Sequence, residues 1–592
     1  MQRMADYLIE KVLEAGADHV FFVPGSGCGV LVDALVKNQD IHGISMHHEQ
    51  AAGMAALTYA QVTGKIGACV VTTGCGGTNA VTALLHAYQD NIPCVFISGQ
   101  VEYKHTIQNS GLNIRQFGRQ ETNIVKIVSS ICKYAVTLTD PKRVPYEIEK
   151  AIHIAASGRK GPVWIDVPLN IQASMVDTDK SDKYTAHEET YAPRDDDVDY
   201  VVNAVNNCER PVILAGNGVK MAGAVSELKE LIYKKDIPMT FTRLGTGILD
   251  ADDKHSIGMA GSMGASRCGS FALQNSDLVL CLGTRLSINT TGYEYEKFAR
   301  NAKIIVVDID EVEHSKQTIR IDHFVKADVK LFLKALNEKS EGGGTFTGWL
   351  DKCGHWKEAL PILFDEFDDH EKMDMYNLAG HISKKLADDA IVVCDAGDAF
   401  YVGTTGFDYK ASQKCITSGG QAEMGYALPG AVGAAFAAKR PIIVFTGDGS
   451  IMMNIQELAT IAHYKLPLKI VIVSNNGYAC IRKGHKESYR RYIGCDAEGG
   501  LGLPSFEKLA NGFDIKYVRA EDGTQIDDAF DAAMNYDGPV IIEAMCKESQ
   551  DFLTVALMKN KNRRLVSSPL EDQAPFMDRE LFEKEMIVDP ME

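Results

Sequence analysis

The stretch from Pro441 to Ser488 holds oxygen-bearing side chains at a spacing suited to binding a metal ion and a phosphate group. Asp448 is a carboxylate ligand, and Asn475, 27 positions later (475 − 448), is an amide ligand. Gly477 can add a backbone carbonyl from a turn. Oxygen ligands in this number suit Mg²⁺, which keeps several waters and is shared with phosphates. The residues therefore predict that Asp448, Asn475 and Gly477 hold Mg²⁺ beside a diphosphate.

The elements around this set would bring it to one edge of a sheet. Apolar runs at Ile442–Phe445 and Leu468–Val473 are typical of strands, and a helix is expected between them from about Ser450. In a βαβ unit the two strands are parallel, so their polar ends meet where open α/β sheets bind ligands. Gly447 and Gly449 let the backbone approach phosphate oxygens, and the free N–H groups of the helix start favour the same anion.

Composition sets the class of protein. The chain has 592 residues, a net charge of −18, and hydrophobic residues at 45%, which fits a multidomain globular protein and argues against general nucleic-acid binding. No apolar run reaches the roughly 20 residues of a membrane span, and the N-terminus lacks the pattern of a signal peptide. Fourteen cysteines without a C-x-x-C pair favour free thiols. We therefore expect a cytoplasmic protein that binds neither nucleic acid nor membrane.

Alternating helical and strand-like segments predict an α/β fold of three doubly wound parallel-sheet domains. We expect a first domain over residues 1–175, a central domain over 190–340 and a third domain over 349–545, followed by a C-terminal tail at 546–592. Polar linkers are expected at 176–197 and 338–345. The tail could wrap another surface or cover a site, and the first and third domains could be copies of one fold; the sequence decides neither.

The motif in the third domain resembles a known family. GDGSIMMNIQELATI followed by LPLKIVIV is similar to the large subunit of acetolactate synthase and its relatives, which use thiamine diphosphate (ThDP) and Mg²⁺. The resemblance implies that Ser450 and Tyr478 also contact the cofactor. Ser474 stands where the family has asparagine, so Asn476 with the carbonyl of Tyr478 is the alternative ligand pair.

His47-His48-Glu49-Gln50 precedes a helical run in the first domain. Glu49 could simply be a carboxylate that complements the start of a helix. In the family that the sequence resembles, this glutamate hydrogen-bonds the N1′ atom of the aminopyrimidine. Such a contact makes the 4′-amino group acidic enough to serve as a base, so the resemblance implies that Glu49 is catalytic.

Other motifs match the family more loosely. Gln120 would face the bound intermediate as a second catalytic residue. The apolar Met424 would support the bent cofactor and hold its base against the reacting carbon. The cofactor-binding residues that the resemblance implies in this group are Pro24, Gly25, Thr73, Gly74, Asn79, Gly397 and Met424.

The central domain resembles the FAD-holding domain of acetolactate synthase. Its candidate residues are Arg159, Gly216, Arg285 and Asp308. Gly216-Asn217-Gly218, after a predicted strand, supplies only two of the three glycines of the dinucleotide-binding fingerprint. Some relatives keep this domain without flavin. FAD is therefore left open.

The resemblance implies decarboxylation of a 2-oxo acid, with pyruvate favoured, and transfer of the acyl-anion equivalent to a carbonyl acceptor. Arg119 and Gly484 replace aromatic residues of the family, so a larger acceptor, such as a keto-sugar nucleotide, is the first alternative. A simple decarboxylase, a flavin oxidoreductase and a non-catalytic relative are the others. A homodimer or homotetramer is expected, since the family forms its site across two subunits.

Overall fold

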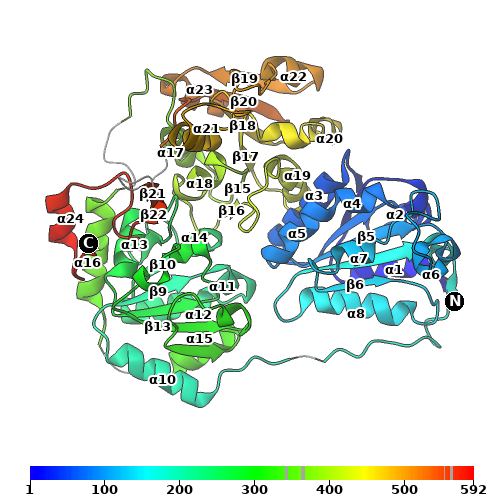
Figure 1. Ribbon diagram of the computed structural model, residues 1–592, viewed down its shortest axis with the longest axis horizontal. Coiled ribbons are helices and arrows are strands. Elements are labelled where there is room, and N and C mark those ends of the chain that lie inside the picture. The colour runs from blue at the N-terminus through cyan, green and yellow to red at the C-terminus, as the bar shows by residue number, and fades with distance from the viewer. Residues whose placement is uncertain (188, 341–343, 362–366, 552–553, 560–564, 592) are drawn as a thin grey trace.

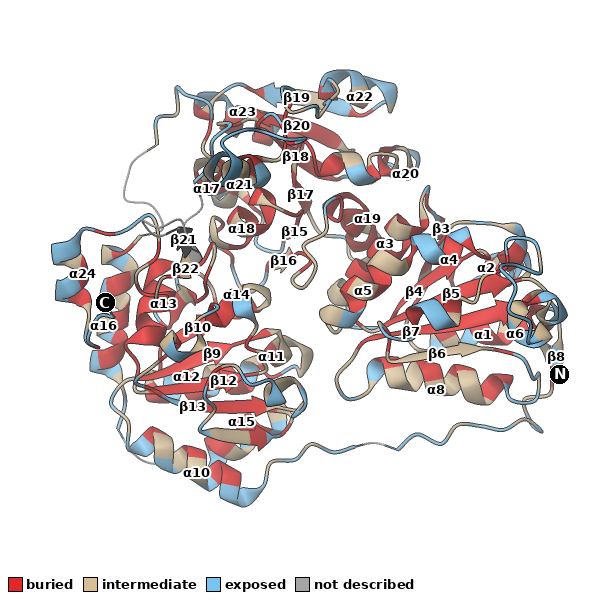
Figure 2. Cartoon of the chain, viewed as in Figure 1, coloured by how far each residue is buried: buried red, intermediate tan, exposed pale blue. Residues whose placement is uncertain are grey.

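The structure is a computed structural model that describes residues 1–592 except 188, 341–343, 362–366, 552–553, 560–564 and 592. Three six-stranded parallel sheets, each with helices on its faces, form three α/β domains (Figure 1). The predicted fold class is confirmed. Most strands are buried along their whole length, as Figure 2 shows, because helices cover both faces of each sheet.

The first domain has the strand order β3-β2-β4-β5-β7-β6. Its strands are β2 (His19–Phe22), β3 (His42–Ser45), β4 (Gly67–Val71), β5 (Cys94–Gln100), β6 (Tyr134–Thr137) and β7 (Pro162–Pro168). Its main helices are α1 (Met4–Glu14), α2 (Gly29–Lys37), α3 (Glu49–Thr63), α4 (Cys75–Asn79), α5 (Val81–Gln89), α7 (Ile124–Val128) and α8 (Val144–Ala156).

The third domain repeats this topology. Its order is β16-β15-β17-β18-β20-β19. When the strands are numbered within each domain, both sheets have the order 2-1-3-4-6-5, with the second and the fifth strand at the two edges. The strands are β15 (Ile391–Cys394), β16 (Lys414–Ile416), β17 (Ile442–Gly447), β18 (Lys469–Ser474), β19 (Lys516–Ala520) and β20 (Val540–Met545). The helices are α17 (Met375–Lys385), α18 (Asp398–Thr405), α19 (Ala427–Ala437), α20 (Glu457–His463), α21 (Ala479–Tyr489), α22 (Phe506–Gly512) and α23 (Gly523–Met534). The two domains therefore share one fold, which the sequence left undecided.

The central sheet has a different order, β11-β10-β9-β12-β13-β14. Its strands are β9 (Pro211–Ala215), β10 (Met239–Phe241), β11 (Ser256–Met259), β12 (Leu278–Leu282), β13 (Lys303–Asp308) and β14 (His323–Lys326). Helices α10 (Asp195–Asn206), α11 (Asn217–Met221), α12 (Val225–Lys235), α13 (Arg267–Gln274), α14 (Ile288–Thr291) and α15 (Val329–Lys339) surround it. Numbered within the domain this is the order 3-2-1-4-5-6, which is typical of dinucleotide-binding folds.

Two helices of small residues join the first and third domains. Helices α3 and α19 pack against each other within one hydrophobic cluster that includes Ala51, Ala55, Ala427 and Ala431. A Cβ atom at Gly433 would lie 2.0 Å from the carbonyl oxygen of Ala55. Glycine at this position therefore permits the close approach of the two helix backbones.

Two segments differ from the expected layout. The α-helix expected from about Ser450 starts as a 3₁₀ turn, η6 (Ile451–Asn454), before α20, so no α-helical N-terminus faces the site at that point. The expected boundary at residue 349 falls inside α16 (Thr347–Ala359), whose residues Trp349 and Trp356 pack into a core cluster of the central domain.

The C-terminal segment also packs on the central domain. Glu571 accepts hydrogen bonds from Gln274 and Arg300, and α24 (Arg579–Glu585) lies along α16 (Figure 1). Among the described residues, no helix is long and apolar enough to cross a membrane.

Candidate active site

The residues singled out in the third domain lie at the carboxyl ends of β17 and β18, next to the point between β15 and β17 where the strand order reverses. The Asp448 carboxylate accepts hydrogen bonds from the backbone N–H groups of Asn475 at 3.0 Å and Gly477 at 3.1 Å. Burial raises the pKa of Asp448 to about 6, and these amide donors oppose that rise. The turn after β18 thus wraps around the carboxylate.

The two neighbouring amides in this turn face different surroundings. Asn475 is buried, and its Nδ2 donates to Asp398 Oδ2 at 3.4 Å, which leaves its Oδ1 on the opposite side of the amide. Asn476 is exposed and donates to Glu548 at 3.4 Å. Because only Asn475 has its side chain buried beside the carboxylate, the geometry favours Asn475 over Asn476 as the ligand.

Gly477 has a φ of 113° and packs directly on Cys495, whose carbonyl oxygen would lie 2.2 Å from a Cβ atom at this position. A side chain here would therefore displace the turn. Around a Cβ atom at Gly447, by contrast, no atom lies within 4 Å among the described residues, and at Gly397 only Cys480 Sγ comes within that range. These two glycines border open space next to Asp448.

Glu49 is the first residue of α3 and is 8% exposed. Its Oε2 accepts a hydrogen bond from Asn79 Nδ2 at 2.9 Å, and Gly76 lies beside Oε1. Within the described part of the chain, no protein group donates a hydrogen bond to Oε1. One carboxylate oxygen is therefore held by the protein and the other is available to a ligand.

The other candidates in the first domain lie at its own switch point, between β2 and β4. Pro24 and Gly25 follow β2, and Thr73 and Gly74 follow β4. Thr73 Oγ1 is buried without a hydrogen-bond partner among the described residues. Gln120 is exposed, and its carbonyl oxygen would lie 2.2 Å from a Cβ atom at Gly74, so the loop that ends at Gln120 rests on this turn.

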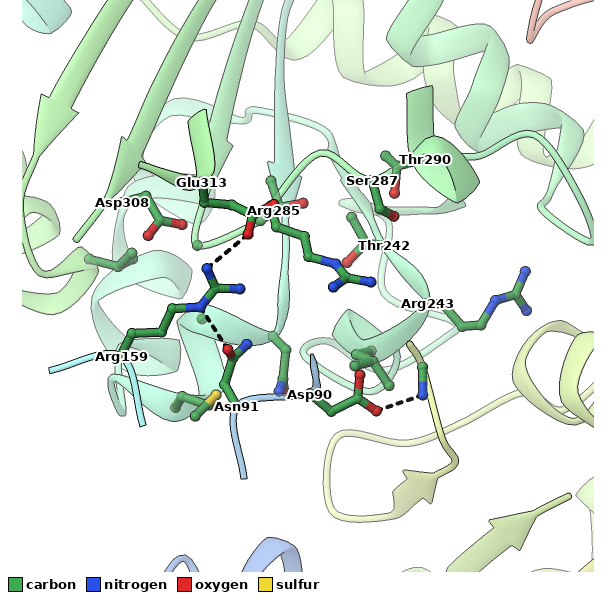
Figure 3. Close-up of a pocket in the computed structure, with 18 of the residues that line it drawn as sticks. Asp90, Asn91, Arg159, Thr242, Arg243, Arg285, Ser287, Thr290, Asp308 and Glu313 are labelled. Atoms are coloured by element: carbon green, nitrogen blue, oxygen red, sulfur yellow. Dashed lines mark hydrogen bonds and ion pairs between the residues drawn. The ribbon is translucent and has the colours of Figure 1, made fainter. Parts of the chain in front are cut away.

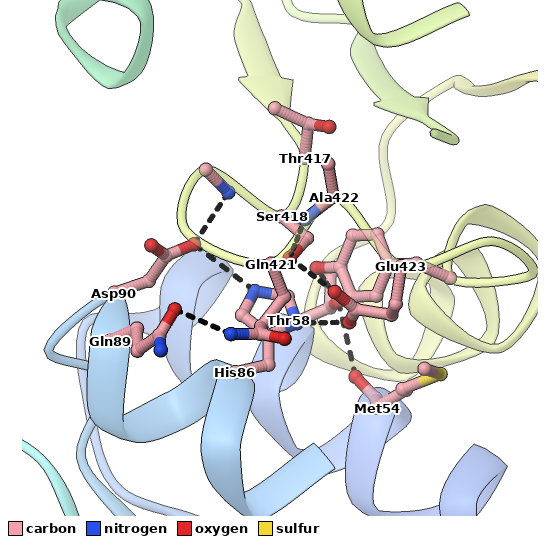
Figure 4. Close-up of polar contacts among 12 residues, drawn as sticks. Met54, Thr58, His86, Gln89, Asp90, Thr417, Ser418, Gln421, Ala422 and Glu423 are labelled. Carbon is pink, nitrogen blue, oxygen red and sulfur yellow. Dashed lines mark hydrogen bonds and ion pairs between the residues drawn. The ribbon is translucent and has the colours of Figure 1, made fainter. Parts of the chain in front are cut away.

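A buried ion cluster ties the first domain to the turn that precedes α19. His86 Nδ1 lies 2.7 Å from Glu423 Oε1, and its Nε2 lies 3.3 Å from Asp90 Oδ2 (Figure 4). Asp90 also accepts the backbone N–H of Gly419 at 2.7 Å. Burial alone lowers the pKa of His86, but Glu423 and Asp90 outweigh it and raise the pKa to about 10. The imidazolium thus fixes the turn that presents Met424, which is 37% exposed.

The residues expected to hold a dinucleotide meet at a cavity of about 240 Å³ over the carboxyl ends of the central strands (Figure 3). Arg159, Arg285 and Asp308 line it. Gly216 lies outside the lining and packs on Gly283, where a Cβ atom would lie 2.2 Å from the carbonyl oxygen. The cavity opens at the switch point between β9 and β12, where this sheet type binds dinucleotides.

The charges in this cavity are unevenly paired. Arg159 Nη1 contacts Asp310 at 2.6 Å and Glu313 at 2.8 Å. Arg285 makes a 3.5 Å hydrogen bond to the Gln89 carbonyl, and no carboxylate lies within 4.0 Å of it in the described ranges. An arginine without a carboxylate partner in a cavity suits a phosphate-bearing ligand.

Sequence reasoning missed Arg243, which lines the same cavity from the central domain. Its Nη2 donates to the Met263 carbonyl at 2.6 Å, its Nη1 donates to Thr404 Oγ1, and its Cζ lies 4.5 Å from the centroid of the Phe400 ring. Burial lowers its pKa to about 10. A single arginine after a strand has no spacing signal, so only the packing of the central domain on α18 identifies it.

His86 and Asp398 were also missed. Asp398 accepts from Asn475 and from Cys480 Sγ at 2.8 Å, and burial raises its pKa. The sequence offered one signal for Asp398: it directly follows Gly397, which was already a predicted cofactor-binding residue. His86 gave none, since its two partners lie 4 and 337 positions away in the sequence.

The donor set fits Mg²⁺ and a diphosphate. In the described part of the chain no group of three His, Cys, Asp or Glu side chains could hold a metal. Around Asp448 the structure offers a carboxylate with amide and carbonyl oxygens. That arrangement suits Mg²⁺ shared with phosphates. The buried carboxylate of Glu49, with one free oxygen, suits a ring nitrogen that carries a proton.

Comparisons with known proteins agree with this geometry. The chain matches family models of thiamine pyrophosphate enzymes: the N-terminal TPP binding domain over residues 2–120, the central domain over 198–336 and the C-terminal TPP binding domain over 384–544. It is 30% identical over 553 residues to the acetolactate synthase large subunit of Lactococcus lactis, covering 92% of this chain and 93% of that protein.

Two further relatives match at similar levels. The probable acetolactate synthase large subunit of Methanococcus aeolicus is 31% identical over 90% of both chains. The chloroplastic acetolactate synthase of Arabidopsis thaliana is 30% identical over 93% of this chain and 82% of its own length.

Proposed function

This chain belongs to the thiamine pyrophosphate enzymes related to acetolactate synthase large subunits, and from that premise we propose that it decarboxylates pyruvate and transfers the acyl unit to a carbonyl acceptor. The observation that carries the proposal is the pair of preformed sites: Glu49 with a free carboxylate oxygen, and Asp448 enclosed by the turn at Asn475. A non-catalytic relative has no need to keep both.

Bound ThDP supplies the acidic thiazolium carbon and the electron sink for decarboxylation. Glu49 would hold the proton at the pyrimidine ring nitrogen, and Asn79 orients its carboxylate. Met424 would support the cofactor with an apolar side chain. Gln120 would face the substrate from the loop that rests on Gly74.

Mg²⁺ would be held by Asp448, by Asn475 Oδ1 and by the carbonyl oxygen of Gly477. The hydrogen bond from Asn475 Nδ2 to Asp398 supports this assignment, because it turns the amide oxygen away from Asp398. Gly447 and Gly397 leave room for the diphosphate. Ser450, Gly449 and Tyr478 complete the surroundings of the carboxylate.

We further propose that the central cavity binds FAD. Three features support a dinucleotide: the strand order 3-2-1-4-5-6, the acidic Asp308 at the end of β13, and Arg285, which has no carboxylate partner among the described residues. Denatured purified protein should release a compound with the absorption spectrum of a flavin. Arg285→Ala should reduce the flavin content of the purified protein at least tenfold. An R285A protein with full flavin content would contradict this assignment.

The assembly proposed is a homodimer or homotetramer. Exposed apolar side chains at Met453 and Ile481 lie on segments that flank the cofactor-binding turns, which supports a second copy covering them. Mass measured by light scattering would decide between monomer and oligomer.

The decisive test replaces Glu49. With ThDP, Mg²⁺ and pyruvate, Glu49→Gln should consume pyruvate about 10² to 10⁴ times more slowly, because the ring nitrogen loses its proton-binding partner. ThDP affinity measured by calorimetry should change far less. Glu14→Gln, an exposed residue of the same domain, is the control. Wild-type turnover by E49Q would refute the proposal.

A larger acceptor is the second candidate. Gly484, on α21, has no atom within 4 Å of a Cβ position among the described residues, so the surface after the metal turn is open. If acetolactate is the sole efficient product formed from pyruvate with a panel of ketone and aldehyde acceptors, this candidate fails.

A further inference from the structure

Three exposed cations that have no carboxylate partner among the described residues lie just beyond the cofactor-binding turn. Lys486, Arg490 and Arg491 stand at the end of α21 and in the segment that follows, and all three are exposed. Within the described ranges, none has a carboxylate within 4.0 Å. The whole chain carries a net charge of −18, so the local positive charge of this cluster is opposite in sign to the net charge of the protein.

The neighbouring cations on the same helix have structural roles. Arg482 is buried and donates to the carbonyl oxygens of Asn475 and Asn476 at 2.7 and 2.8 Å, which stabilises the metal turn. Lys483 pairs with Asp551 at 2.7 Å. The three unpaired residues therefore differ from their neighbours in having no partner in the described protein.

The chain holds this cluster close to the predicted metal site. After Arg491 it returns to the turn, where the carbonyl oxygen of Cys495 accepts the N–H of Tyr478 at 2.8 Å. Five extended residues span at most about 17 Å, so Arg490 lies no further than that from Cys495. A nucleoside diphosphate joined to a small sugar is long enough to bridge a separation within this limit.

Aromatic surface accompanies the charge. Tyr489 is 61% exposed and Tyr492 is 37% exposed. Exposed tyrosine rings beside guanidinium groups can stack on a nucleobase while the arginines contact phosphate oxygens.

We propose that Arg490 and Arg491, with Lys486, bind the diphosphate of a nucleotide-linked carbonyl acceptor, whose carbonyl end reaches the cofactor-binding turn. This inference rests on the proposed function and names its acceptor class. The cations give the acceptor its affinity, and the absence of a side chain at Gly484 leaves its path open. Salt weakens this binding because the cations are exposed.

The test is calorimetric titration of UDP and of uridine into protein saturated with ThDP, Mg²⁺ and FAD, which fill the other phosphate sites. UDP should bind at least tenfold more tightly than uridine. The double variant Arg490→Gln/Arg491→Gln should weaken UDP binding at least tenfold, and Arg490→Lys/Arg491→Lys should restore part of it. Lys465→Ala/Lys508→Ala removes the same charge from exposed positions of the same domain and should leave the affinity unchanged.

Several results would overturn the inference. The first is UDP binding no tighter than uridine binding. The second is a loss of UDP affinity in Lys465→Ala/Lys508→Ala as large as that in Arg490→Gln/Arg491→Gln. The third is a changed oligomeric mass of Arg490→Gln/Arg491→Gln, which would assign the segment to a subunit interface. Inorganic pyrophosphate and ADP, titrated in parallel, separate recognition of the diphosphate from recognition of the base. Pyruvate consumption by the wild type is measured separately, so failure of the proposed function is distinguishable from failure to bind UDP.

Discussion

At the residue scale, the contacts of one side chain separate two chemically identical neighbours. Asn475 and Asn476 are adjacent amides, yet one is buried against Asp398 and the other is exposed against Glu548. The two amides diverge where the backbone turns, since Asn476 and Gly477 both have positive φ values, of 64° and 113°. A ligand role can therefore be assigned to one position and tested against the other.

Replacing Asn475 by Ala should weaken Mg²⁺-dependent ThDP binding at least tenfold, because an oxygen ligand is lost while the backbone N–H to Asp448 remains. Asn476→Ala, with the same chemical change, should bind ThDP as the wild type does. Calorimetric titration of ThDP at several Mg²⁺ concentrations measures both. Equal losses in the two variants would contradict the assignment of Asn475.

The charge of His86 predicts a pH dependence of stability. Its pKa is raised in the folded protein to about 10, above the ordinary value near 6.5, so its contribution is complete below pH 6.5 and is lost as pH rises through about 10. The difference in melting temperature between wild type and His86→Leu should shrink between pH 7 and pH 10. A constant difference would mean that the imidazolium is not what holds Glu423 and Asp90.

At the element scale, the contact between α3 and α19 positions the first domain against the third. Both helices are rich in alanine and glycine, so their backbones approach closely and bury a shared apolar cluster. Glu49 is the first residue of α3, and Met424 lies just before α19. Small residues in these helices therefore set the placement of two candidate cofactor contacts.

Gly433→Ala should destabilise the protein by about 1 to 3 kcal/mol, because the added methyl group overlaps the Ala55 carbonyl oxygen. Gly380→Ala, in α17, meets no atom within 4 Å and should be neutral or stabilising, since alanine favours helix. Thermal unfolding of the two variants provides the comparison. A Gly433→Ala protein as stable as Gly380→Ala would show that the helices separate at little cost.

At the scale of the whole molecule, the C-terminal segment crosses from the third domain back to the central one. Glu585 accepts hydrogen bonds from Lys352 at 2.6 Å and from Trp356 at 3.0 Å, and it lies 3.1 Å from His355 Nε2. Burial raises the pKa of Glu585, but Lys352 and His355 outweigh it and hold the pKa at about 2. These contacts fasten α24 to α16 and so join the end of the chain to the central domain.

Glu585→Ala should lower the free energy of unfolding by about 1 to 3 kcal/mol, because it leaves the buried N–H of Trp356 without its acceptor and removes the partner of Lys352. It should also expose the segment after residue 546 to limited proteolysis. The exposed Glu583→Ala on the same helix should change neither. Proteolysis patterns that match between the two variants would contradict this role.

The amino-acid sequence by itself determined the α/β class and indicated Asp448 as a candidate metal ligand, because apolar runs and short polar motifs are local patterns. The catalytic role expected for Glu49 came only from the family resemblance. The predicted strands Ile442–Phe445 and Leu468–Val473 agree with β17 (Ile442–Gly447) and β18 (Lys469–Ser474) to within two residues at each end. The helix expected from about Ser450 is present, but it begins with the 3₁₀ turn η6 and becomes α-helical only at Glu457, the start of α20. Local helix propensity does not determine the backbone conformation of the first turn of a helix where it packs against the edge of a sheet.

Only the tertiary structure decided which distant residues meet. The pairing of His86 with Glu423 joins positions 337 apart, and the docking of Arg243 on α18 and of the C-terminal segment on α16 depends on how domains pack. It also decided the strand orders, which place the polar turns of each sheet at its switch point. Contacts of this kind arise from burial between surfaces far apart in the chain, and no short pattern in the sequence encodes them.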